Sequence, residues 1–361
     1  MLDANTSQWV KSAAIADVIL VLASPRSHAT SGALFPGESW RMNMRAWNAR
    51  RACWHRKQDM NRCVNLGAFS VQSQSKIIDY IFKCAMGQNL KRKISEREMQ
   101  RFEDMVAIVV GGADNIGRAT AVMLAEGGAH VVIGYHANAS GAQEGMAEIE
   151  AAGGQAIAVQ VDHSREDSVT ALIDLTVSTF GKINILVNNA AKIGGDFLKR
   201  DRDVASMDAD YWDDVMVNNL RGPMLTCKHS IPHMIAAGGG AIVNTGSGVV
   251  FRGDSVRTAY SASKIGLHSL TMDIATTYGK QNIRCNLVSP GLTMTRSVTE
   301  SLEQHHINAL AAQNLVPFVG EPKDLANVTC FLASPAARYV TGQIIAVDGG
   351  LHVHQCVVGQ L

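Results

Sequence analysis

Short apolar runs alternate with helical patterns from about residue 105 almost to the end of the chain. Runs of about four to eight residues rich in Val, Ile and Ala are typical of buried strands, and the stretches between them carry apolar residues at helical spacing. The expected strands are VAIVV (106–110), HVVIGY (130–135), AIAVQVD (156–162), INILVNNA (183–190), AIVNTGS (241–247), IRCNLVSPG (283–291) and QIIAVDGG (343–350). Apolar strands that alternate with helices predict an α/β fold: a doubly wound, parallel, seven-stranded sheet of the Rossmann type.

The first 98 residues differ from the rest in charge and in pattern. They hold 15 Lys and Arg against 7 Asp and Glu, whereas the remainder holds 18 basic and 25 acidic residues. Apolar periodicity is lacking, so we expect a basic, poorly ordered N-terminal extension over 1–98 and a Rossmann-fold domain over 99–361. Tryptophans among the arginines of 41–58 leave open an arm that binds nucleic acid, which we disfavour. Upstream sequence with no evolved fold, ahead of a natural start at Met99, also stays open.

Several classes of protein are not expected. The apolar run 13–23 is too short for a membrane span and is broken by Asp17, so we expect neither a membrane anchor nor an export signal. The cysteines are odd in number and contain no C-x-x-C pair, which argues against a zinc site and a disulfide framework. They are Cys53, Cys63, Cys84, Cys227, Cys285, Cys330 and Cys356. The sequence therefore predicts a cytoplasmic protein with reduced thiols and no metal.

A glycine-rich turn, G-G-A-D-N-I-G-R (111–118), follows the first strand and opens the first helix. Such a turn lets backbone N–H groups approach a pyrophosphate at the helix N-terminus, so it favours a dinucleotide site. The second strand ends at Gly134-Tyr135-His136 without the Asp or Glu that often binds the ribose of NAD. NADP is slightly favoured and NAD stays possible, because Asp114 in the turn would repel a 2′-phosphate.

A second group of polar residues follows later strands. Ser247 ends the strand 241–247, and Y-S-A-S-K (260–264) places Tyr260 and Lys264 four residues apart, on one face of a helix. Asn219 follows a helical run one unit earlier. Ligands gather at the carboxyl ends of the strands in such sheets, so these four residues are candidates for chemistry.

From about 103 to 352 the chain resembles a short-chain dehydrogenase/reductase of the single-domain type, similar to the ketoacyl-reductase-like members. Besides Ser247, the matching motifs stand in family order and at family spacing. They are V-G-G-A-D-N-I-G (110–117), V-D-H (161–163), N-N-A (188–190), N-L-R-G (219–222), Y-S-A-S-K (260–264), S-P-G-L-T-M-T (289–295) and V-T-G-Q-I-I-A-V-D-G-G (340–350). The resemblance implies an NAD(P)-dependent oxidoreductase that transfers a hydride between a nicotinamide cofactor and an alcohol or ketone.

The resemblance also implies a role for each matching residue. Tyr260 would be the general acid/base, and Lys264 would favour the phenolate and bond the nicotinamide ribose. Ser247 would hold the substrate oxygen, and the backbone carbonyl of Asn219 would keep a water on a proton path to solvent. The residues expected to bind the cofactor are Gly111, Asp114, Asn115, Ile116, Gly117, Tyr135, His136, Asp162, His163, Asn189, Ala190, Tyr260, Lys264, Pro290, Gly291 and Thr293.

Three positions depart from the family pattern: Val110, Asn115 and Ala191 stand where threonine, glycine and glycine are usual. Asn tolerates a left-handed backbone better than most residues, so we expect cofactor binding to survive. Because the four catalytic positions match, we prefer an enzyme to the alternative, a non-catalytic dinucleotide-binding Rossmann protein.

Two further expectations concern partners. Family members commonly form tetramers through the helices that carry Asn219 and Tyr260, so a homotetramer is expected. The substrate would lie between 191–210, 248–259 and 292–317, and the charged loop 191–210 is expected to be mostly solvated surface. The sequence does not identify the alcohol or ketone.

Overall fold

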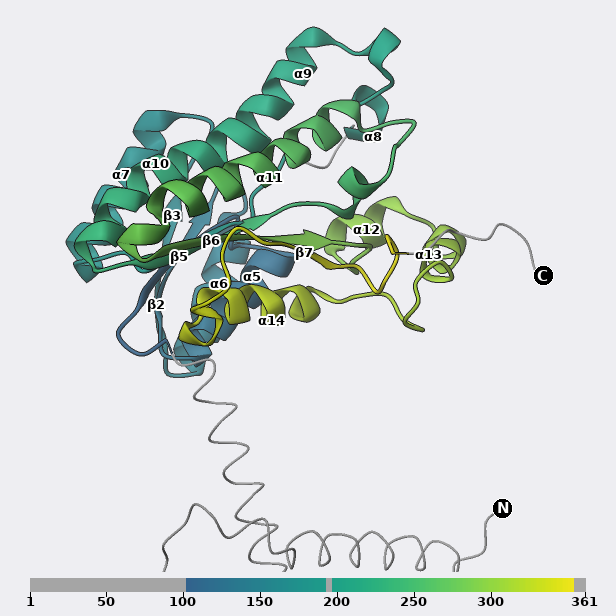
Figure 1. The fold of residues 1–361 in the computed structure, drawn as a ribbon. Helices are drawn as coiled ribbons and strands as arrows, with labels where there is room; N and C mark the ends of the chain where they lie inside the picture. The colour runs from purple at the N-terminus through teal and green to yellow at the C-terminus, as the bar shows by residue number, and fades with distance from the viewer. Residues whose placement is uncertain (1–101, 193–196, 354–361) are drawn as a thin grey trace, which may run out of the picture. The chain divides into compact units, whose positions relative to one another are not determined.

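The computed structural model describes residues 102–192 and 197–353. Within them, seven parallel strands form one sheet in the order β3-β2-β1-β4-β5-β6-β7 (Figure 1). The strands are β1 (Val106–Val110), β2 (His130–Tyr135), β3 (Gln155–Gln160), β4 (Ile185–Asn188), β5 (Gly240–Thr245), β6 (Ile283–Pro290) and β7 (Ile344–Val347). The predicted fold class and all seven strands are confirmed, with ends displaced by three residues at most. The predicted extension 1–98 lies outside the described residues, and the domain boundary stays a prediction.

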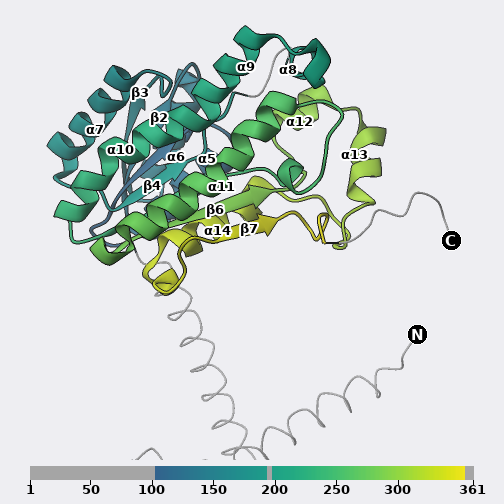
Figure 2. The same ribbon diagram turned by 45° about the horizontal axis from the view of Figure 1, so that its top comes forward.

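Helices follow the strands and cover both faces of the sheet. The main helices are α5 (Asn115–Glu126), α6 (Ala139–Ala151), α7 (Glu166–Phe180), α9 (Ala209–Met216), α10 (Gly222–Ala236), α11 (Thr258–Tyr278) and α14 (Pro322–Ala333). Shorter helices are α8 (Phe197–Arg200), α12 (Arg296–Ser301) and α13 (Gln304–Ala311). Helices α5, α6 and α14 lie on one face, and α7, α10 and α11 lie on the other (Figures 1 and 2).

Strand residues divide between two cores because successive side chains point to opposite faces of a sheet. In β1, Val109 packs in the core under α5 and α14 with Leu124 and Leu325. Its neighbour Ile108 packs in the core under α7 and α10 with Leu172. These side chains are fully or almost fully buried, and burying each contributes about 2 kcal/mol. Both faces of the sheet are therefore closed, which explains why the strands read as continuous apolar runs.

The strand order reverses between β1 and β4. From β1 the chain continues to β2 and β3 on one side, and from β4 it continues to β5, β6 and β7 on the other. The loops after β1 and β4 consequently leave the sheet in opposite directions. A crevice opens at the carboxyl ends of the strands at such a point, and ligands bind there in open α/β sheets.

A π-helical turn, Val217–Arg221, joins α9 to α10. The sequence predicts a helical run here but gives no sign of the wider turn. Asn219 lies inside it and is fully buried. π-Helical turns often occur at functional sites, which directs attention to this segment.

Candidate active site

A cavity of about 1190 Å³ opens at the carboxyl ends of the strands. Its volume exceeds the ~300–1,000 Å³ of an ordinary small-molecule pocket, so it has room for a cofactor and a substrate together. Of the predicted site residues, the cavity is lined by Gly111, Asp114, Asn115, Ile116, Tyr135, His136, Asp162, His163, Asn189, Ala190, Ser247, Tyr260, Lys264, Pro290, Gly291 and Thr293. The structure thus brings together residues from every strand end between β3 and β6. Gly117 and Asn219 lie behind the cavity wall.

The glycine turn after β1 is packed tightly against the end of β4. Gly111 has φ +79°, and a Cβ there would lie 2.6 Å from the backbone nitrogen of Ala190. A Cβ on Gly117 would lie 2.0 Å from the carbonyl oxygen of Gly111. Both positions therefore require glycine, so that the N-terminus of α5 can face the cavity. Backbone N–H groups at a helix N-terminus favour a phosphate.

Asn115 replaces the glycine that the family pattern has in this turn. Its φ is +49°, a left-handed conformation that Asn tolerates better than most residues. Its side-chain Oδ1 accepts a hydrogen bond of 2.9 Å from the backbone N–H of Arg296, the first residue of α12. The substitution keeps the turn and adds a bond to the segment after β6.

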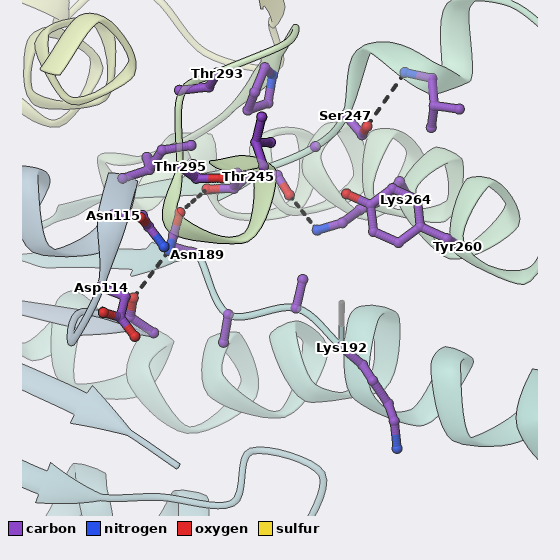
Figure 3. A pocket seen from close by; sticks show the side chains of 18 of the residues that line it. Asp114, Asn115, Asn189, Lys192, Thr245, Ser247, Tyr260, Lys264, Thr293 and Thr295 are labelled. Atoms are coloured by element: carbon purple, nitrogen blue, oxygen red, sulfur yellow. Dashed lines mark hydrogen bonds between the residues drawn. The ribbon is translucent and has the colours of Figure 1, made fainter. Parts of the chain in front are cut away.

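Ser247, Tyr260 and Lys264 meet at the opposite end of the cavity from Asp114 (Figure 3). Ser247 follows β5, whereas Tyr260 and Lys264 lie one turn apart on α11. The Lys264 ammonium lies 5.7 Å from the centre of the Tyr260 ring and donates a 2.8 Å hydrogen bond to the carbonyl oxygen of Thr245. Tyr260 is 7% exposed and Lys264 is 2% exposed, so both ionisable groups are withdrawn from water.

Burial shifts the proton affinity of both groups toward the neutral form. It raises the pKa of the Tyr260 phenol, while a hydrogen bond to Ser247 and the charge of Arg257 act in the opposite direction. It lowers the pKa of Lys264 to about 8. The resting phenol is therefore protonated at neutral pH, although a charged lysine at 264 is expected to favour the phenolate.

Asn219 supports the site from behind. Its Oδ1 accepts a 2.6 Å hydrogen bond from the backbone N–H of Lys192, and its Nδ2 is buried without a partner in the described part of the chain. The neighbouring carbonyl of Asn218 is held by Nε2 of His163 at 2.9 Å. His163 thus touches the π-helical turn as well as the cavity, and it is 8% exposed.

Asp201 supports the helix that carries Tyr260, a role that the sequence does not predict. We expected the charged loop 191–210 to be mostly solvated, but the Asp201 side chain is fully buried. Its two oxygens accept hydrogen bonds of 2.9 Å each from the backbone N–H groups of Ala259 and Tyr260. The carboxylate thereby caps α11 and fixes the backbone that carries the phenol. No local signal marks Asp201, because its partners lie almost sixty residues further along the chain.

Comparisons with known proteins agree with this geometry. Residues 110–352 match the family model described as Enoyl-(Acyl carrier protein) reductase. The chain is 39% identical over 256 residues to a 7alpha-hydroxysteroid dehydrogenase of Bacteroides fragilis, covering 71% of this chain and 97% of that protein. It is 34% identical to 3-oxoacyl-[acyl-carrier-protein] reductase FabG of Staphylococcus aureus, covering 68% of this chain and 98% of that one.

A solved structure gives the same result. A 7alpha-hydroxysteroid dehydrogenase complexed with NADH and 7-oxo glycochenodeoxycholic acid superimposes with a TM-score of 0.66 and 31% identity, over 71% of this chain and 96% of that one. The chain belongs to the short-chain dehydrogenase/reductase family.

As a member of this family, the protein is an NAD(P)-dependent oxidoreductase that binds a nicotinamide cofactor, NAD or NADP. The residues present fit such a cofactor: the tight glycine turn leaves a helix N-terminus facing the cavity, and Lys264 is a buried cation at the far end. No group of three or more His, Cys, Asp or Glu side chains suited to a metal ion occurs in residues 102–192 and 197–353. In the same residues, no helix is both long and apolar enough to cross a membrane.

Proposed function

We propose that Tyr260 is the general acid/base of an alcohol/ketone oxidoreductase, with Ser247, Lys264 and Asn219 in supporting roles. The observation that carries the proposal is the convergence of a buried phenol, a hydroxyl and an ammonium at one end of a cavity with room for two ligands. When bound, the nicotinamide cofactor supplies or accepts the hydride.

The proton chemistry follows from the pKa of the phenol. Because burial raises the pKa of Tyr260, the phenol is protonated at neutral pH and can donate its proton to a carbonyl oxygen during reduction. The hydroxyl of Ser247 holds that oxygen beside the phenol. In the oxidative direction the phenolate must form first, so we expect alcohol oxidation to speed up as the pH rises toward the pKa of Tyr260.

Lys264 and Asn219 prepare the site rather than exchange protons with the substrate. The bond from Lys264 to the Thr245 carbonyl fixes the ammonium one helical turn from Tyr260, where it favours the phenolate whenever it is charged. Asn219 holds the backbone at Lys192 and so keeps the π-helical turn against the site. Its backbone carbonyl is the proposed anchor for a water on a proton path.

Removal of the Tyr260 hydroxyl tests the proposal. Tyr260→Phe keeps the ring and removes the hydroxyl, so we expect kcat with a panel of ketones to fall about 10²- to 10⁴-fold. Binding of NADH or NADPH, measured by fluorescence titration, is expected to change by less than about threefold. Tyr278→Phe, at the far end of the same helix, is the matched control. Unchanged turnover in Tyr260→Phe would contradict the assignment.

A homotetramer is the proposed assembly. Apolar side chains on the outer faces of α10 and α11 support it: Met224, Ile235, Ile265 and Met272 are between 36% and 48% exposed. Charged substitutions such as Ile265→Glu are expected to shift the mass measured by light scattering to that of smaller species. An unchanged mass would argue against this surface.

Residues 99–361 are proposed to suffice for activity, in the cytoplasm. The family match over 110–352 and the free thiols of Cys227, Cys285 and Cys330 support this proposal. A chain that begins at Met99 is expected to keep full kcat and KM. If the full chain binds RNA or DNA in a salt-sensitive manner and the shorter one does not, the extension is a nucleic-acid arm instead.

A further inference from the structure

Asp114 and Asn138 form a pair at the end of the cavity away from Tyr260 (Figure 3 labels Asp114). Strand β2 ends nearby at Tyr135, and the residues that follow it are His136 and Ala137, which also line the cavity. None of these three supplies a carboxylate. The only carboxylate that the glycine turn brings to this end is Asp114, which precedes α5.

The orientation of the Asn138 amide is fixed by its neighbours. Its Oδ1 accepts hydrogen bonds from the backbone N–H of Gly141 at 3.0 Å and from the hydroxyl of Ser140 at 3.1 Å. Since an amide oxygen cannot donate, Nδ2 is the atom that faces the turn, and it donates to Oδ2 of Asp114 at 2.5 Å. The cap of α6 thereby also aims the amide at the carboxylate.

Asp114 is held in an unusual way for a residue that precedes a helix. An Asp at this position commonly accepts a bond from the helix backbone, but the Asp114 side chain makes no such bond. Oδ2 is bound by Asn138, and Oδ1 has no hydrogen-bond partner within 102–192 and 197–353. The carboxylate is only partly buried, so Oδ1 stays available to accept from a hydroxyl in the cavity.

The cations near this end are already engaged. Arg118 is bound to Glu144 at 2.7 Å and to Glu148 at 2.6 Å, across α5 and α6. Arg296 is bound to Glu300 through Nε at 2.8 Å, and this hydrogen bond, followed by the charges of Glu300 and Asp114, raises the pKa of Arg296. A phosphate monoester carries about two negative charges, and at either arginine it would lie close to a carboxylate that already pairs with that arginine.

We propose that Asp114, oriented by Asn138, accepts hydrogen bonds from the adenosine ribose of the cofactor and makes the enzyme prefer NAD to NADP. The carboxylate that usually stands at the end of the second strand is here supplied by the glycine turn. NAD and NADP differ only at the ribose 2′ position, where a hydroxyl suits Oδ1 and a phosphate meets a fixed negative charge. The absence of an acid after β2 slightly favours NADP when the sequence alone is considered. In the folded protein the Asp114 carboxylate lies at this end of the cavity and is oriented by Asn138, and this arrangement favours NAD. This inference rests on the proposed function only in requiring that a dinucleotide binds in the cavity.

Titration of the full chain with NADH and with NADPH tests the inference, by calorimetry at one fixed ionic strength. We expect NADH to bind roughly tenfold to a hundredfold more tightly, the range for one hydrogen bond to a charged group. Asp114→Asn should reduce the ratio of the two dissociation constants by about tenfold. Asn138→Ala should reduce it less, because the carboxylate remains but loses its orientation. Asp174→Asn, which removes an exposed carboxylate from α7, is the matched control and should leave the ratio unchanged.

The adenosine end can be measured by itself with 5′-AMP and 2′,5′-ADP, which lack the nicotinamide. The ratio of their two dissociation constants should change from variant to variant in the same way as the ratio for NADPH and NADH. Such a ratio does not depend on the fraction of protein that is folded. Equal or tighter binding of NADPH by the unaltered chain would overturn the inference alone. If Arg296→Ala then abolished that binding, Arg296 would be the phosphate ligand. Binding of neither dinucleotide would overturn the inference together with the proposed function.

Discussion

Lys264 is a buried ammonium, and the amount by which it lowers the free energy of unfolding can be measured separately from its role in turnover. Lys264→Met replaces the charge with an apolar side chain of similar length. Burial lowers the pKa of Lys264 from 10.5 to about 8. At about 1.4 kcal/mol for each pKa unit, burying the charged form costs about 3 kcal/mol at pH 7. The variant also loses the bond to the Thr245 carbonyl, worth about 1 kcal/mol. We therefore expect its free energy of unfolding to exceed that of the unaltered protein by about 2 kcal/mol.

The pH dependence distinguishes this cause from better packing. Below about pH 8 the ammonium is charged in both the folded and the unfolded protein, so its cost is constant. Between about pH 8 and 10.5 the unfolded chain binds the proton that the folded protein has released, and the stability contributed by Lys264 rises with pH. The difference between the two proteins should accordingly narrow to about 0.5 kcal/mol at pH 9.5.

Urea unfolding of both proteins at several pH values between about 7 and 9.5 provides the assay, and other titrating groups cancel in the difference. Lys323→Met, on the exposed side of α14, is the control and should show a difference that does not change with pH. The variant at 264 should also be nearly inactive, since the site loses its cation. A variant that is less stable at pH 7, or a difference that is flat across this range, would refute the account of a buried, destabilising charge.

Three other substitutions test particular contacts. Asp201→Asn keeps one acceptor at the start of α11, so we expect kcat to fall about tenfold and the unfolding free energy to fall by about 1 kcal/mol, as steady-state kinetics and urea unfolding can show. If KM rises while kcat stays constant, Asp201 does not position Tyr260. Asn115→Ala forces alanine into a left-handed backbone and should destabilise the protein by about 1 kcal/mol in urea, whereas Asn115→Gly should not; equal losses would show that the lost side-chain bond matters instead. Gly117→Ala pushes a Cβ onto the turn and should weaken NADH binding more than tenfold with circular dichroism unchanged, while Gly279→Ala, where a Cβ meets nothing within 4 Å, should do neither.

The fold could be predicted from the sequence because its strands are buried on both faces. A residue such as Val109 is apolar whichever face it points to, so each strand appears as an unbroken run with turn residues at its ends. The glycine turn could be predicted for a related reason, since Gly111 needs a left-handed backbone and leaves no room for a Cβ. Asn115 adopts the left-handed conformation that its residue type suggested.

The sequence could not reveal contacts that only the folded chain creates. In the sequence Asp201 is one more charge in a charged loop. Only in the folded chain does its carboxylate accept hydrogen bonds from the first turn of α11. Asn138 resembles an ordinary helix cap, and its second role depends on Asp114 lying across the turn. The pKa of Tyr260 is raised mainly by burial, which is a property of the surroundings and not of the spacing in Y-S-A-S-K.

The strand order also affects how the protein is made. Ala107 in β1 pairs with Ile185 in β4, so one edge of β1 waits for a partner that is synthesised 78 residues later. At roughly 5–20 residues per second, ribosomes take about 4 to 16 seconds to supply it. During that interval a nascent chain can pair β1 with β2 and β2 with β3, but β1 presents an open edge of a wholly apolar strand. A chain that stalls between β3 and β4 would be prone to aggregate. The yield of folded protein is therefore expected to depend on the speed of translation through this segment.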